Sequence, residues 1–185
     1  MENKEKNTKE KILEEALKLF AQSGYMGTSM NEIASRLGVT KAALYKHYSS
    51  KQEILDSIVE RMNQMDAERA KEYEMPDGDM EEVIAGYKNT AFEKIRQFTK
   101  VQFLHWTEEE FSCCFRKMLT LEQYRDPEMD KLYQNYLAEG PLQYMEAVFS
   151  GIVESGEDAK QLAMDFYGPI SFYTAFMMEQ RINRK

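Results

Sequence analysis

A short segment near the beginning of the chain concentrates side chains that donate hydrogen bonds. They are Thr40, Lys41, Tyr45, Lys46 and His47. Hydroxyl, ammonium, phenol and imidazole groups bond to phosphate oxygens and to base edges, and the rings add stacking surface. A helix that exposes such groups fits a DNA major groove, which is about 12 Å wide. The spacing therefore predicts a segment that contacts DNA.

Two sequence signals indicate the elements that must hold this segment in place. Ser29 followed by Glu32 forms a capping box and begins one helix, and Thr40 caps the next. Gly38 lies between them and takes the left-handed conformation of a tight turn at little steric cost. The pattern predicts a helix-turn-helix at about residues 29–48. Its expected core residues are Ala34, Val39 and Leu44.

Further donors flank the predicted turn and suit phosphate contacts. Ser29 and Thr40 lie at helix N-termini, where backbone N–H groups and the helix dipole favour an anion. Tyr45 and His47 can donate to phosphates from the second helix, and Lys51 can reach a flanking phosphate from the start of the following helix. A helical hairpin with a glycine turn is often purely structural. The whole set of donors, and not the turn alone, indicates DNA.

Charge is divided unevenly along the 185 residues, whose net charge is −8. Residues 1–50 carry eight basic and six acidic side chains, or +2, whereas residues 51–185 carry 16 and 26, or −10. A mildly basic head on an acidic body is typical of a protein that touches DNA with one end. We therefore expect a DNA-binding domain at residues 1–50 and a second domain at residues 51–185.

Composition excludes several classes of protein. Hydrophobic residues make up 43% and charged residues 30%, which is typical of a globular chain. The longest nearly uncharged stretch, residues 162–178, contains Asp165 and Gly168-Pro169, so no membrane span is predicted. The first eleven residues have no apolar segment, so we expect no secretion signal. Adjacent Cys113 and Cys114 cannot build a disulfide framework, and we expect a cytoplasmic protein.

The rest of the chain has the pattern of helices separated by turn signals, with no alternating strand pattern and no internal repeat. The clearest break is Met75-Pro76-Asp77-Gly78, and Gly140-Pro141 is expected to split or kink a later helix. We predict an all-α protein with about nine helices. The expected helices cover residues 8–23 (capped by Thr8), 29–37, 40–48, 50 onward, 79–106, 107 onward, 128–153 and 158–181.

From residue 12 to residue 55 the chain resembles the TetR (tetracycline-repressor-like) family of bacterial transcriptional regulators. The resembling residues are Ile12, Ala16, Phe20, Gly24-Tyr25, Thr28-Ser29, Ile33-Ala34, Leu37-Gly38-Val39, Leu44-Tyr45-Lys46-His47-Tyr48, Ser50-Lys51 and Leu55. The resemblance implies a three-helix DNA-binding head on a larger helical body for ligand binding and dimerisation. Such proteins are usually homodimeric repressors that a small molecule releases from a palindromic operator.

The resemblance also assigns DNA contacts to individual positions. The expected set is Thr28, Ser29, Thr40, Lys41, Ala42, Ala43, Tyr45, Lys46, His47 and Lys51. Within this set the first turn of the second helix, residues 40–43, reads bases, and the other positions hold the DNA backbone. Ala42 and Ala43 can make only apolar contacts, for example with a thymine methyl group. Direct readout then falls mainly to Thr40 and Lys41, and specificity leans on DNA shape or on a second bound dimer.

The body, residues 51–185, holds most of the aromatic and Met residues, which suit either an ordinary core or an adaptable pocket. We expect a small hydrophobic or aromatic effector there. The candidate pocket residues are His105, Trp106, Phe115, Met118, Tyr144 and Phe172. His105 and the vicinal Cys113 and Cys114 do not make a convergent ligand set, so we expect no metal and no cofactor. We expect buried, inert thiols, and the alternative is a cysteine that senses thiol-reactive compounds.

The last two long helices are the expected homodimer interface, because small and apolar residues recur along them. The small residues are Gly151, Ser155, Gly168, Ser171 and Ala175. The apolar residues are Tyr133, Tyr136, Met145, Val148, Ile152, Phe172 and Phe176.

The function that these features favour is a ligand-responsive DNA-binding regulator, with double-stranded DNA and a small effector as partners. The alternative is a helical ligand-binding or protein-interaction module whose head does not read DNA specifically. The two alanines in the base-reading turn motivate this alternative. No catalytic constellation or phosphate-binding glycine loop is present, so we do not expect an enzyme.

Overall fold

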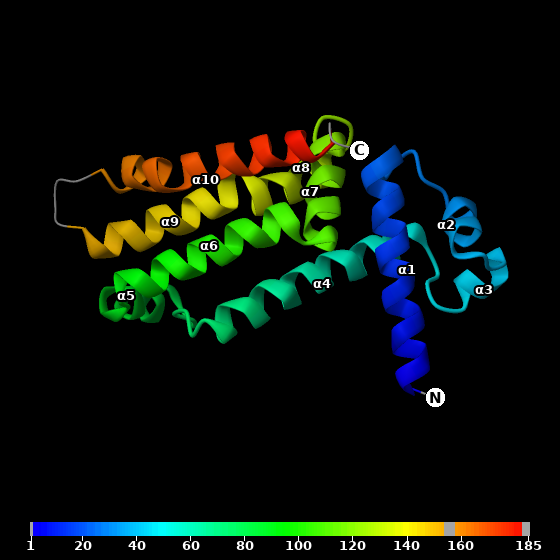
Figure 1. The fold of residues 1–185 in the computed structure, drawn as a ribbon, viewed down its shortest axis with the longest axis horizontal. Helices are drawn as coiled ribbons and strands as arrows, with labels where there is room; N and C mark the ends of the chain where they lie inside the picture. Colours follow the sequence, from blue (N-terminus) through cyan, green and yellow to red (C-terminus); the bar gives the residue numbers. More distant parts are fainter. Residues whose placement is uncertain (1, 154–157, 183–185) are drawn as a thin grey trace. The chain divides into compact units, whose positions relative to one another are not determined.

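The computed structural model describes residues 2–153 and 158–182, and every regular element in these ranges is an α-helix (Figure 1). The predicted all-α class is confirmed. The ten helices of the described residues are α1 (Glu2–Ser23), α2 (Met30–Leu37), α3 (Lys41–Tyr45), α4 (Lys51–Glu72), α5 (Met80–Asn89), α6 (Phe92–Glu108), α7 (Glu110–Glu122), α8 (Pro127–Leu137), α9 (Glu139–Ile152) and α10 (Ala159–Ile182).

Several helix boundaries differ from those that the sequence indicated. Helix α1 begins at Glu2, so Thr8 lies inside it and does not cap it, since nothing in the preceding Glu- and Lys-rich residues breaks a helix. The expected helix 79–106 is divided at Thr90, whose Oγ1 donates to the Gly86 carbonyl at 2.9 Å and whose backbone is extended. The break expected near Gly140-Pro141 is found just before these residues, between α8, which ends at Leu137, and α9, which begins at Glu139. Pro141 therefore lies in the first turn of α9, where a proline is tolerated.

The chain divides into two compact units and passes between them three times. One unit comprises residues 1–66 and 110–130, and the other comprises residues 67–109 and 131–185. The first unit therefore contains the predicted head together with the first part of α4 and the whole of α7. Whether the functional boundary falls at residue 50 stays a prediction.

The core of the first unit explains why α7 belongs to it. Helix α1 carries its apolar side chains at helical spacing, and Ala16, Leu17 and Phe20 are at most 1% exposed. Helix α7 packs against α1 (Figure 1). It supplies side chains that are completely buried. Full burial of each large side chain stabilises the fold by about 1.5–3 kcal/mol. The α1–α7 contact thus holds the platform on which α2 and α3 rest.

In the second unit α10 lies along α9, and α9 also packs against α5 (Figure 1). The α5–α9 contact is close because Gly151 has no side chain: a Cβ there would lie 2.5 Å from Ile84 Cγ2. Val148 and Ala163 are at most 1% exposed and form part of this unit's core. Across the described residues, no helix is long and apolar enough to cross a lipid bilayer.

Candidate nucleic-acid interface

The start of α2 is fixed by the predicted capping box. Ser29 is extended, its Oγ accepts from the Glu32 backbone N–H at 3.3 Å, and the Glu32 carboxylate accepts from the Ser29 N–H at 2.7 Å. Hydrogen bonds from the Ser29 hydroxyl and N–H lower the pKa of Glu32, so the carboxylate stays ionised. Ser29 is exposed at this helix N-terminus, but a phosphate arriving there must compete with Glu32 for its donors.

The turn between α2 and α3 depends on the backbone of Gly38. Its φ is +67° and ψ is 28°, the left-handed conformation that the sequence predicts. No atom would contact an added Cβ within 4 Å, so the glycine is required by conformation and not by space. Leu44 (0% exposed) and Ala34 (3%) fill the core beside this turn, as expected. Val39 does not, because its side chain is 43% exposed on the outside of the turn.

Helix α3 presents one face to the interior and another to solvent. Leu44 and Tyr48 point inward and are 0% and 4% exposed. Thr40 caps the helix by accepting from the Ala43 N–H at 3.2 Å. The exposed residues are Lys41, Ala42, Tyr45 and Lys46, which have the i, i+1, i+4, i+5 spacing of one helical face. Helix α3 is shorter than expected, since residues 46–48 continue as a turn.

Two of the expected donors, Lys41 and His47, have their side chains arranged by the protein itself. The Lys41 ammonium lies 5.7 Å from the centroid of the Tyr45 ring, within range of a cation–π contact. His47 is half-buried, and its Nδ1 is buried without a hydrogen-bond partner. A buried acceptor without a partner costs less than a buried N–H without one, which favours the tautomer with the proton on Nε2. His47 then keeps an N–H donor.

Thr28 and Lys51 use their polar atoms inside the protein. Thr28 is 3% exposed and its hydroxyl donates to the Gly24 carbonyl at 2.8 Å. The Lys51 ammonium donates to the carbonyls of Tyr25 at 2.6 Å and Thr28 at 2.8 Å, and lies 4.3 Å from the Tyr25 ring centroid. Burial lowers the pKa of Lys51. Both residues hold the α1–α2 loop, and a phosphate contact by either remains a prediction.

Replacing Lys51 by Met separates these two roles. We expect Lys51→Met to lower the free energy of unfolding by about 2–3 kcal/mol, because two loop carbonyls lose a charged donor. Urea denaturation measures this loss, and Lys51→Arg is the matched control that keeps the charge and the donors. Unchanged stability together with weaker binding to every duplex would instead make Lys51 a phosphate ligand.

Sequence reasoning missed the partner of this loop on α4. The Tyr25 hydroxyl donates to Gln52 Oε1 at 2.8 Å, and the Tyr25 ring meets Phe20 edge to face with centroids 5.1 Å apart. The available signal was an aromatic residue directly after the helix-ending Gly24. Tyr25, Gln52 and Lys51 together tie the start of α4 to the loop that positions Ser29.

The structure does not bring the six expected pocket residues into one unit. Phe115 and Met118 are completely buried residues of the first unit, and their place in an effector pocket stays a prediction. In the second unit Tyr144 is 39% and Phe172 66% exposed. His105 is 2% exposed. Trp106 follows it on α6, and these two remain as candidates.

The His, Cys, Asp and Glu side chains of the described residues do not gather into a metal centre. In the part of the chain that the structure describes, no group of three His, Cys, Asp or Glu side chains converges on a possible ion position. Cys113 is buried and Cys114 half-buried, and burial together with the Glu110 charge raises the pKa of the Cys114 thiol. A raised pKa disfavours the reactive thiolate.

Comparisons with known proteins match the helix-turn-helix region. The profile of the family described as "Bacterial regulatory proteins, tetR family" matches residues 12–58. The HTH-type transcriptional regulator YerO of Bacillus subtilis, itself uncharacterized, is 31% identical over 137 residues, which are 70% of this chain and 45% of YerO. The Staphylococcus epidermidis negative transcriptional regulator IcaR of the biofilm operon icaADBC is 42% identical over 52 residues, 28% of each chain. The matches thus span less than half the length of these curated relatives.

A solved structure extends the likeness over most of the chain. The TetR family transcriptional regulator PfmR of Thermus thermophilus is 26% identical with a TM-score of 0.57, covering 89% of this chain and 84% of PfmR. The profile match agrees with the observed helix-turn-helix, which has a capped α2, a glycine turn and an exposed face on α3. The helix-turn-helix region of the chain, residues 12–58, belongs to the tetR family of bacterial regulatory proteins, and most of the chain is similar in fold to PfmR of that family.

Proposed function

We propose that this protein is a ligand-responsive DNA-binding transcriptional regulator. Its proposed action is that of a repressor that a small molecule releases from a palindromic operator. The observation that carries the proposal is the division of α3 between a buried side, which bears Leu44, and an exposed side, which bears Lys41, Ala42 and Tyr45. A helix held in this way presents its exposed face to a major groove.

Each expected contact residue of the head has a proposed role at the operator. Thr40 and Lys41 hydrogen-bond base edges, and Ala42 and Ala43 contact thymine methyl groups. Tyr45, Lys46 and His47 donate to phosphates, and Ser29 binds a phosphate when Glu32 gives way. Thr28 and Lys51 act first by holding the loop that carries Ser29. IcaR is described as a negative regulator, which agrees with the repressor role.

We propose a homodimer built on α10. This helix exposes large apolar side chains that a lone protomer leaves in water: Met164 (48% exposed), Phe172 (66%), Tyr173 (58%), Phe176 (46%) and Met177 (47%). Large apolar side chains that are exposed together on one helix favour association. A second copy is the fitting occupant, because a two-fold pair of heads reads half-sites about 34–36 Å apart, or a multiple of that.

Two of the residues expected at this interface have partners within their own protomer. Val148 is 1% exposed, so it belongs to the core of the second unit. Gly151 permits the close approach of Ile84 from α5. Ser155 lies outside the described residues. The proposed seam therefore rests on α10, with Tyr144 and Ile152 of α9 at its margin, 39% and 38% exposed.

The proposed release by an effector is a shift between two conformations. Helix α4 begins in the first unit at Lys51 and ends in the second, so a ligand held by the second unit can alter the head through it. A ligand shifts the equilibrium only by its differential affinity for the two states. A preference of about 100-fold for the released state supplies about 2.7 kcal/mol. The effector class expected from the sequence is small and hydrophobic or aromatic.

Titrating DNA with salt tests the DNA-binding proposal. We expect a duplex selected from a random pool to bind far more tightly than a scrambled duplex, with affinity falling steeply as salt rises. Lys41→Ala should relax the preference at one base position by about 1–3 kcal/mol. Fluorescence anisotropy measures both effects. Equal and weak binding to every duplex would favour the alternative, a helical binding module whose head does not read DNA.

A further inference from the structure

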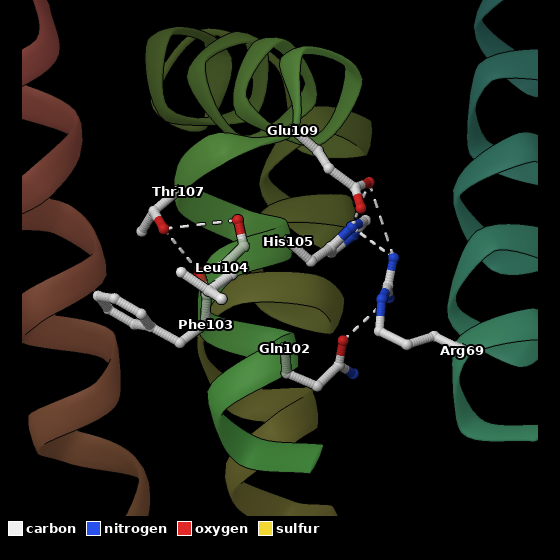
Figure 2. A network of polar contacts seen from close by, with 7 residues as sticks. All are labelled: Arg69, Gln102, Phe103, Leu104, His105, Thr107 and Glu109. Atoms are coloured by element: carbon white, nitrogen blue, oxygen red, sulfur yellow. Dashed lines mark hydrogen bonds and ion pairs between the residues drawn. The ribbon is translucent and has the colours of Figure 1, made fainter. Parts of the chain in front are cut away.

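The second unit contains a buried polar cluster that the DNA-binding role does not use (Figure 2). Arg69 extends from α4 towards α6 and is only 7% exposed. Its Nη1 donates to Gln102 Oε1 at 2.9 Å, and its Nη2 contacts His105 Nδ1. His105 Nδ1 also lies 2.7 Å from Glu109 Oε2. A guanidinium in so dry a setting binds oxyanions strongly, because its fork of donors matches two oxygens.

His105 Nδ1 cannot satisfy both of its neighbours at once. A neutral imidazole nitrogen carries either a lone pair, which accepts from Arg69, or a proton, which it donates to Glu109. The contact with Arg69 requires the lone pair, and the proton then sits on Nε2. The Glu109 carboxylate, 3.9 Å from Arg69 Nη2, faces that lone pair. The ring therefore has two exclusive hydrogen-bonding states.

We infer that Arg69 receives an oxyanion, a carboxylate or phosphate group, on a ligand with a short apolar chain. When the anion binds the Arg69 guanidinium, the contact between Arg69 and His105 Nδ1 is lost. The imidazole proton of His105 then moves from Nε2 to Nδ1, and the Nδ1–H donates to Glu109. The ring stays neutral throughout. Glu109 is the solvent-exposed member of the cluster, with a side chain that is 49% exposed, whereas the side chain of His105 is fully buried.

The apolar chain of such a ligand has matching side chains one turn away. Tyr73, directly after the end of α4, and Phe98 on α6 lie four residues from Arg69 and Gln102 respectively, and their ring centroids are 6.0 Å apart. Both are half-buried. A charged anchor beside two aromatic rings fits a ligand with an anionic head and a hydrocarbon tail.

The cluster also lies where the chain passes between its units. Arg69 is the third residue after the passage at 66/67, and Glu109 is the last residue before the passage at 109/110. Helix α7 starts at Glu110 and packs against α1. A change in the partners of Arg69 and Glu109 therefore acts at two connections to the DNA-binding unit. This inference rests on the proposed ligand-responsive function and names the chemistry of its ligand.

Calorimetry on the full chain with three probes tests the inference. Hexanoate and hexyl phosphate carry the anion, and hexanamide is the uncharged counterpart. We expect at least one anion to bind about tenfold or more tightly than hexanamide, and the tighter one identifies the source of the oxyanion. Arg69→Gln should abolish that difference and Arg69→Lys should reduce it. Arg96→Gln changes an exposed arginine of the same helix as His105, and it should leave the difference in affinity between the anion and hexanamide unchanged.

The protonation of the His105 imidazole nitrogens is a second measurement, and it would not change with the anion if the cluster were merely structural. The chain has two histidines, so the His47→Gln variant leaves His105 alone in a long-range ¹H–¹⁵N spectrum. Nδ1 should be unprotonated in the free protein and protonated with the anion bound. If neither anion binds better than hexanamide, or if Nδ1 does not change, the inference is wrong. Operator binding without any probe is measured in parallel, so a failure of the DNA-binding proposal is seen separately.

Discussion

Placing glutamates at Phe172 and Phe176 should split the proposed dimer and lower operator affinity by about 100-fold or more. Both phenylalanines are largely exposed in the protomer, so the double change Phe172→Glu and Phe176→Glu removes nothing from its core. At a two-fold seam it buries four carboxylates without partners, which is strongly unfavourable. Each DNA-binding head then binds its half-site alone. The gain in affinity from linking two binding sites, a factor of about 10²–10⁴, is lost.

Sedimentation velocity measures the association and anisotropy measures the operator affinity. Phe92→Glu is the matched control, because Phe92 is 79% exposed at the first turn of α6, on a different helix from the proposed seam. It should leave both quantities unchanged. A double variant that sediments as an intact dimer would show that the protein associates through another surface.

The helix-turn-helix was predictable because its signals are local. The capping box at Ser29 and Glu32, the left-handed Gly38 and the Thr40 cap are each decided within four residues, and each takes the predicted geometry. Exposure of the residues at 41, 42, 45 and 46 then follows from helical periodicity once Leu44 is buried. Local chemistry determines this part of the interface without any long-range contact.

The interior of the molecule was less predictable because it depends on partners far along the chain. Lys51 looks like a surface lysine in the sequence, but carbonyls 23 and 26 residues earlier capture its ammonium. Phe115 and Met118 are residue types that are common in ligand pockets, but they lie in the core where α7 packs against α1. Arg69 gives no sequence signal, because it becomes a candidate only when α4 places it beside His105, 36 residues later.

A carboxylate at position 42 should nearly abolish DNA binding. Ala42 is exposed, and it is the second residue of α3, where the helix dipole tolerates a negative charge. Ala42→Glu should therefore leave the fold intact. Docking the variant helix in a groove would bring the new carboxylate among phosphates and base acceptors, a repulsion of several kcal/mol. We expect affinity for the selected duplex and for random duplexes to fall by about 100-fold or more.

The most direct test of the exposed face of α3 measures the fluorescence anisotropy of a labelled selected duplex with the Ala42→Glu variant. The matched control is Ala85→Glu, at an exposed alanine of α5. Binding that disappears for the first variant and persists for the second is the predicted result. If both variants bind the duplex as the unchanged chain does, α3 does not enter the groove, and the DNA-reading role assigned to this helix is contradicted.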